Sequence, residues 1–131
     1  MWLFTNTGFV SAVSNGQDLM VRSRDRESLE PLAESAKTEI LSTPQNDYPY
    51  RVIVTHEIFS RWVAHMATGI TYKNFKSEVA STRGYDFAHP LMKVWSAMHE
   101  VEDLSSRRTN GYDHTKAKEK QCSLNYKRNR R

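Results

Sequence analysis

The first 24 residues alternate between hydrophobic, β-prone runs and turn-forming residues. Two short runs, Trp2–Thr5 and Phe9–Val13, flank Asn6-Thr7-Gly8, which is the spacing of a hairpin with a glycine turn. A second turn at Ser14-Asn15-Gly16 leads to Leu19–Arg24, where hydrophobic and polar positions alternate as in a strand with one solvated face. The pattern predicts three antiparallel strands.

The next 45 residues change between helical and strand patterns. Pro31 suits the first turn of a helix, whose apolar stripe runs to about Leu41 and is followed by a loop over 42–47. Tyr50–Val54 is the predicted fourth strand. Thr55 is a predicted N-cap for a helix over Glu57–Thr68, which Gly69 would end.

Two further helices are predicted, over Asn74–Ser81 and from Pro90 onward. The second carries a stripe of large apolar residues at intervals of three and four: Leu91, Val94, Trp95, Met98 and Val101. The order β-β-β-α-β-α-α-α predicts an α+β fold, with a small antiparallel sheet and three or four helices. The last three helices would lie C-terminal to the strands and pack on one face of the sheet.

Composition narrows the class of protein. The chain has 131 residues, of which 38% are hydrophobic and 26% are charged, as in one soluble globular domain. It has no apolar run long enough to span a membrane and no pattern of a secretory signal. The lone Cys122 fits a reducing compartment, so we expect a cytoplasmic protein.

The net charge of +4 is divided unevenly along the chain. Residues 1–106 contain ten Lys or Arg and thirteen Asp or Glu, a charge of −3, whereas residues 107–131 carry +7. The basic residues of this second segment are Arg107, Arg108, Lys116, Lys118, Lys120, Lys127, Arg128, Arg130 and Arg131. We therefore expect one α+β domain over 1–106 and a basic tail over 107–131 that is flexible or ordered by a partner.

Two clusters are candidate binding residues. In the first, Arg22 and Arg24 share a strand face and Arg26 follows at a turn, which would suit phosphates or an acidic protein surface. The alternative is an edge strand kept soluble by charge. The second cluster combines aromatic and basic residues, as in base-stacking platforms and protein-interface hot spots: Tyr48, Tyr50, Arg51, Tyr72, Lys73 and Lys76. Its alternative role is packing at the ends of strands and helices.

The sequence contains no recognised catalytic motif. The five histidines form no H-x-x-x-H or H-E-x-x-H pair, and one cysteine cannot supply a zinc knuckle. No nucleophile elbow and no glycine-rich phosphate loop occurs. We therefore expect no catalytic residues, no metal and no cofactor, although scattered carboxylates leave a small metal-dependent nuclease open.

Several segments, in the same order along the chain, resemble a family of short conserved proteins of bacteria, notably actinobacteria, and of their phages. The segments are Met1–Phe4, Gly8–Ser11, Val21–Arg24, Asp47–Arg51, Tyr72 with Asn74–Ser77 and Val79, and Val94-Trp95. No activity is assigned to that family, so the resemblance implies a domain over about 1–103 and no chemistry. The basic tail departs from the usual end of such proteins.

Three functions follow from these features. The first is a non-enzymatic binding module whose basic tail contacts nucleic acid or a nucleoprotein complex. The second is an accessory or inhibitor protein of a phage or mobile element that contacts a host protein complex. The third is the small nuclease.

Overall fold

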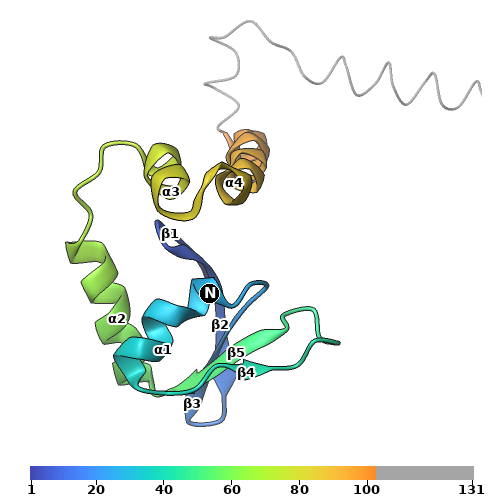
Figure 1. Cartoon of the computed structure of the whole chain (residues 1–131), viewed down its shortest axis with the longest axis vertical. Coiled ribbons are helices and arrows are strands. Elements are labelled where there is room, and N and C mark those ends of the chain that lie inside the picture. Colours follow the sequence, from blue (N-terminus) through green and yellow to red (C-terminus); the bar gives the residue numbers. More distant parts are fainter. Residues whose placement is uncertain (103–131) are drawn as a thin grey trace, which may run out of the picture. The chain divides into compact units, whose positions relative to one another are not determined.

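The structure, a computed structural model, describes residues 1–102 (Figure 1). Met1–Met92 form one compact unit, and a second unit begins at Lys93, inside the last long helix. The predicted end of the domain near residue 106 and the basic tail over 107–131 lie outside the described residues.

The sheet has five antiparallel strands in the order β1-β2-β3-β5-β4. They are β1 (Trp2–Thr5), β2 (Gly8–Asn15), β3 (Asp18–Ser23), β4 (Leu41–Ser42) and β5 (Tyr50–Val54). The three predicted N-terminal strands and the strand over Tyr50–Val54 are confirmed. The two-residue β4 was not predicted, because so short a strand has no alternation to detect.

Four α-helices and two 3-10 turns complete the described chain. They are η1 (Glu27–Leu29), α1 (Glu30–Ala36), α2 (His56–Thr68), α3 (Phe75–Arg83), α4 (Tyr85–Met98) and η2 (His99–Val101). Because three α-helices follow the last strand, the predicted α+β class is confirmed. Thr55 caps α2 as predicted, since its hydroxyl accepts a hydrogen bond from the Ile58 backbone N–H at 3.2 Å.

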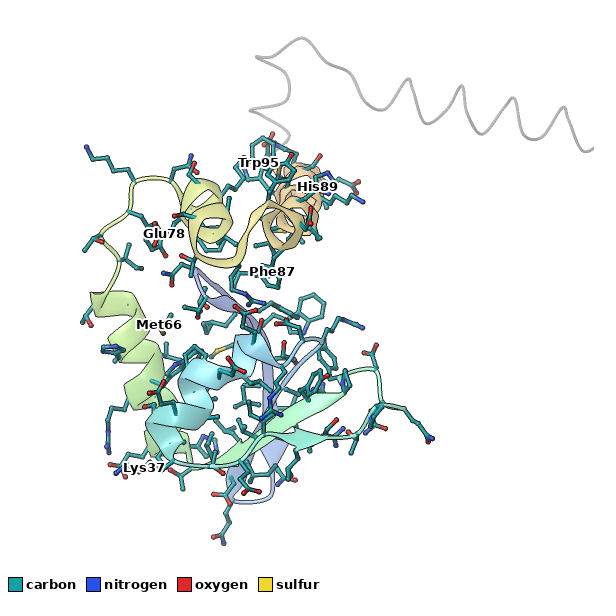
Figure 2. All side chains as sticks on the ribbon, in the orientation of Figure 1. Lys37, Met66, Glu78, Phe87, His89 and Trp95 are labelled. Atoms are coloured by element: carbon teal, nitrogen blue, oxygen red, sulfur yellow. The ribbon has the colours of Figure 1, made fainter. Side chains whose placement is uncertain are left out.

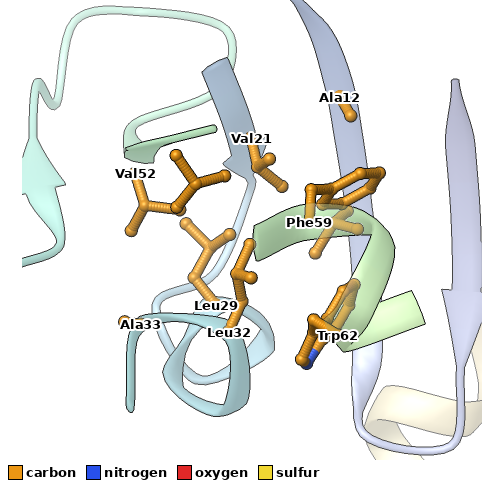
Figure 3. Close-up of a cluster of buried hydrophobic side chains, with 10 residues drawn as sticks. Ala12, Val21, Leu29, Leu32, Ala33, Val52, Phe59 and Trp62 are labelled. Atoms are coloured by element: carbon orange, nitrogen blue, oxygen red, sulfur yellow. The ribbon is translucent and has the colours of Figure 1, made fainter. Parts of the chain in front are cut away.

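The hydrophobic core lies where α1 and α2 meet one face of the sheet (Figure 3). Alternate residues of the central strands supply one half of it, and the inward stripes of η1, α1 and α2 supply the other. The buried set is Val10, Ala12, Val21, Leu29, Leu32, Ala33, Val52, Val54, Phe59 and Trp62. Trp62 is 2% exposed, and its ring lies 5.8 Å from that of Phe59.

Two predicted helix boundaries are wrong. The first helix ends at Ala36 rather than near Leu41, because Lys37 adopts a left-handed conformation (φ 51°) that stops it. The last helix begins at Tyr85, so Pro90 lies inside it. Gly84 has a φ of 86°, a conformation that glycine adopts readily, so the break between α3 and α4 falls there.

The apolar stripe of α4 is not the core face that its spacing predicted. Trp95 is 56% exposed, and Val94, Met98 and Val101 are exposed as well (Trp95 is labelled in Figure 2). Helical periodicity identifies an apolar face but carries no information on what covers that face. The spacing of the stripe therefore does not place Trp95 in the core.

Candidate functional site

The second face of the sheet carries a row of residues that crosses all five strands. Successive side chains of a strand point to opposite faces, so the positions between the core residues form this second face. The register places Trp2 opposite Ser11, Ser11 opposite Arg22, Arg22 opposite Arg51, and Arg51 opposite Leu41. We call Trp2, Ser11, Arg22, Arg51 and Leu41 the arginine row.

Two arginines meet at the centre of this row without a carboxylate to balance them. Arg22 on β3 and Arg51 on β5 are directly paired, an arrangement in which like charges repel. Among the ion pairs of residues 1–102, none includes either side chain. The Nε atoms of both are buried and have no hydrogen-bond partner in that part of the chain. Two neighbouring guanidinium groups without a carboxylate partner favour an anion as ligand.

A tyrosine ring supports the arginines from the loop before β5. Tyr48 is buried, and the guanidinium carbons of Arg22 and Arg24 lie 4.6 and 4.8 Å from its ring centroid. A guanidinium over an aromatic face at such distances is attracted by about 0.5–2 kcal/mol. Arg51 donates hydrogen bonds to the Tyr48 carbonyl oxygen, at 3.3 Å, and to the Thr43 hydroxyl. Tyr48 therefore holds three cationic side chains in one cluster.

Arg24 differs from the other two because it has an acidic partner. Its Nη1 donates to Asp47 Oδ1 at 2.8 Å and its Nη2 to Oδ2 at 3.3 Å. These hydrogen bonds, together with the charge of Asp47, raise the pKa of Arg24 above its ordinary value. Both side chains are more than half exposed, so water and salt screen the pair. An anionic ligand would compete with Asp47 for Arg24.

Three aromatic rings lie beside the arginines on the same face. Phe4 and Phe9 are paired across β1 and β2, and Trp2 is two residues from Phe4. The Trp2 and Phe9 rings meet edge to face with centroids 5.7 Å apart, and the Phe4 and Phe9 centroids are 4.7 Å apart. Trp2 is nevertheless 69% exposed. None of these rings is among the site residues predicted from the sequence, although the alternation of Trp2 and Phe4 places them on one face.

A second polar cluster is centred on Arg83 at the end of α3. This side chain is only 6% exposed and forms ion pairs with Asp25 Oδ2 (2.8 Å) and Glu27 Oε1 (2.9 Å). It also donates a 2.6 Å hydrogen bond to the Thr7 carbonyl oxygen, and its guanidinium lies 3.9 Å from the ring centroid of Phe87 (Figure 2). Arg83 therefore joins α3 to the β1–β2 turn, to the start of η1 and to the segment before it.

The Asp25 carboxylate is held in its ionised form by this cluster. Burial raises the pKa of Asp25, but hydrogen bonds from Ser28 and Arg83 and the positive charge of Arg83 outweigh burial and leave the pKa below its ordinary value. Ser28 donates to Asp25 through both its backbone N–H (3.0 Å) and its hydroxyl (2.7 Å). Because two carboxylates and a backbone carbonyl hold the Arg83 side chain, we assign the cluster a structural role.

The structure brings together four of the predicted binding residues, namely Arg22, Arg24, Tyr48 and Arg51. The proposed alternative of an edge strand at Arg22–Arg26 is wrong, because β3 lies between β2 and β5. Arg26 is separate from the cluster and pairs with Glu30 at 3.9 Å.

The remaining predicted residues do not join this cluster. Tyr50 is paired with the buried Ser23 and packs against the hydrophobic core, so it faces the other side of the sheet. Tyr72 and Lys73 belong to the link between α2 and α3, and Lys76 to the first turn of α3; the link lies away from the β4–β5 loop (Figure 1). The nine basic tail residues lie outside the described part of the chain.

Other features of residues 1–102 offer no further chemistry. No group of three or more His, Cys, Asp or Glu side chains within this range could hold a metal ion. An open hollow of about 670 Å³ along α1 is lined by acids and bases together, including Arg26, Glu30 and Lys37. No helix in the same range is long and apolar enough to cross a membrane.

Comparison of the chain with protein-family models, with curated proteins and with solved structures gave no match.

Proposed function

We propose that this protein is a non-enzymatic binding module that contacts nucleic acid through the arginine row and the basic tail. The observation that carries the proposal is the direct pairing of Arg22 with Arg51, two cations that take part in none of the ion pairs of residues 1–102. A phosphate oxygen would accept from the terminal nitrogens of these guanidinium groups and would neutralise two charges that otherwise repel each other.

The distribution of charge along the sequence supports the same proposal. Residues 1–106 carry −3 and residues 107–131 carry +7, so the tail supplies the long-range attraction to a polyanion. If six to nine phosphates are contacted, the logarithm of affinity falls against the logarithm of salt concentration with a slope of roughly −5 to −8. The arginine row adds contacts in a fixed arrangement, because backbone pairing sets the positions of its members.

The test is a salt titration of binding to labelled oligonucleotides by fluorescence anisotropy, with the full chain. Replacing Arg22 or Arg51 by Ala is expected to weaken binding and to make the salt slope less steep by about 0.7–0.9 per lost phosphate contact. Arg61→Ala is the matched control, since Arg61 is an exposed arginine on α2 that pairs with Glu57 at 2.7 Å. Replacing Lys127, Arg128, Arg130 and Arg131 by Gln should reduce the slope by about 3.

Two results would count against the proposal: no saturable binding of the full chain at low salt, or Arg22→Ala and Arg51→Ala proteins that bind like Arg61→Ala. Circular dichroism of each variant shows whether a loss of binding reflects a loss of fold.

A second candidate function is contact with a protein partner, favoured by the exposed apolar residues at both ends of the arginine row, Trp2 and Leu41. Arginine together with an exposed tryptophan is typical of protein-interface hot spots. This alternative predicts a stoichiometric partner whose capture is weakened by the combined change Arg22→Ala and Arg24→Ala. A partner that is captured equally well by that double variant would argue against it.

A further inference from the structure

We infer that the nucleic acid is single stranded and lies across the open face of the sheet, with its phosphates at Arg22 and Arg51 and its bases stacked on Trp2 and Phe4. This inference rests on the proposed function and adds to it the class of nucleic acid and the role of the aromatic rings. It begins from the fact that the rings and the arginines share one face.

The aromatic rings are both accessible and held in place. Trp2 and Phe4 are exposed, yet each has ring contact with Phe9 from the neighbouring strand. The backbone of β1 is anchored beside them, since the Ala12 N–H donates a 2.8 Å hydrogen bond to the Met1 carbonyl oxygen. Rings that are already ordered lose little conformational freedom when a base stacks on them.

The register sets the separation between the rings and the arginines. Ser11 lies between Trp2 and Arg22 in the arginine row and is only 1% exposed, so its own side chain is not available to a ligand. Neighbouring strands are about 4.8 Å apart, so Trp2 and Arg51 are separated by about 14 Å along the row. One short oligonucleotide could therefore contact both kinds of side chain.

A single strand suits this combination better than a duplex or a protein. Unpaired bases have free faces, and stacking on aromatic side chains next to a basic groove is how many proteins bind single strands without reading sequence. The bases of a duplex are stacked on one another, so the rings would gain that contact only by unstacking the duplex. The unpaired charges of Arg22 and Arg51 complement a phosphodiester backbone, which carries one negative charge per nucleotide.

The experiment compares three labelled probes with the full chain: single-stranded DNA, single-stranded RNA of the same sequence, and a DNA hairpin duplex of equal length. Trp2→Ala is expected to weaken single-strand binding by about tenfold to a hundredfold and to leave duplex binding unchanged. Trp2→Phe, which keeps a ring, should retain most of the affinity. Trp95→Ala removes an exposed tryptophan from α4 and is the matched control.

Salt dependence separates stacking from charge. Trp2→Ala removes no charge and should leave the salt slope unchanged, whereas Arg22→Ala should reduce it. Two results would overturn the inference while the proposed function stands. The first is that single strands and duplex bind equally well and that both lose affinity in Arg22→Ala. The second is that Trp2→Ala and Trp95→Ala bind single strands with the same affinity. Absence of binding to all three probes would overturn both.

Discussion

Replacement of Arg83 by Met tests whether one buried cation holds α3 to the N-terminal part of the sheet. Methionine keeps an unbranched, apolar side chain but removes the guanidinium group and its charge. The change deletes two ion pairs and the hydrogen bond to the Thr7 carbonyl oxygen, at a side chain that is 6% exposed. Loss of one partner from a fully buried pair costs about 3–5 kcal/mol. Because Asp25 and Glu27 are themselves 37% and 62% exposed, we expect Arg83→Met to lower the free energy of unfolding by about 2–4 kcal/mol.

The assay is urea denaturation of the full chain, followed by circular dichroism and by tryptophan fluorescence. Arg61→Met is the matched control, since it makes the same chemical change at a side chain that is 72% exposed and paired with Glu57. Loss of that exposed pair should lower the free energy of unfolding by about 0.3–0.5 kcal/mol. If Arg83→Met lowers the free energy of unfolding no more than Arg61→Met does, the structural role assigned to the cluster is refuted.

The pH dependence of this effect has a definite sign. The native structure lowers the pKa of Asp25 below its ordinary value of 3.8, so the ionised carboxylate stabilises the native state at pH values above 3.8. That contribution is lost as the pH falls through the lowered value. The difference in stability between the wild-type protein and Arg83→Met should therefore be constant between about pH 5 and 7 and shrink below about pH 4.

Four further substitutions have expected outcomes. Trp62→Ala should lower the free energy of unfolding by about 3–5 kcal/mol, and Trp95→Ala by less than about 1 kcal/mol, because only Trp62 is buried; equal values in urea denaturation would refute the core assignment. Gly8→Ala should cost more than about 1 kcal/mol in the same assay, since its Cβ would lie 2.1 Å from the Ser28 hydroxyl oxygen. Asp47→Asn should strengthen oligonucleotide binding and steepen the salt slope by about 0.7–0.9, because it frees the arginine that Asp47 now pairs with.

Local signals in the sequence were sufficient for most of the fold. The β-prone runs around a glycine turn identified β1 and β2, and alternation identified β3. The strand β5 was predicted from its own residues, and α2 from the hydroxyl of Thr55 and the following apolar stripe, because each of these patterns lies within or beside one element. The end of α1 depended on the left-handed conformation of Lys37, a residue with no intrinsic preference for it. Exposure of Trp95 depended on what packs against α4, which periodicity does not encode.

The candidate site required information from residues far apart in the chain. Arg22–Arg24 and Tyr48–Arg51 were singled out separately by composition, but their meeting depends on the pairing of β3 with β5. No local pattern gives that register. The same holds for the Arg83 cluster, in which an arginine contacts acids 56 and 58 residues earlier in the chain, Glu27 and Asp25.

The most direct test of the account is the salt dependence of oligonucleotide binding by the full chain and by its Arg22→Ala and Arg61→Ala variants. We predict saturable binding with a slope of roughly −5 to −8, unchanged in Arg61→Ala and less steep by about 0.7–0.9 in Arg22→Ala. Binding that is absent at low salt, or that has the same slope and affinity in both variants, would contradict the claim that the arginine row binds nucleic acid.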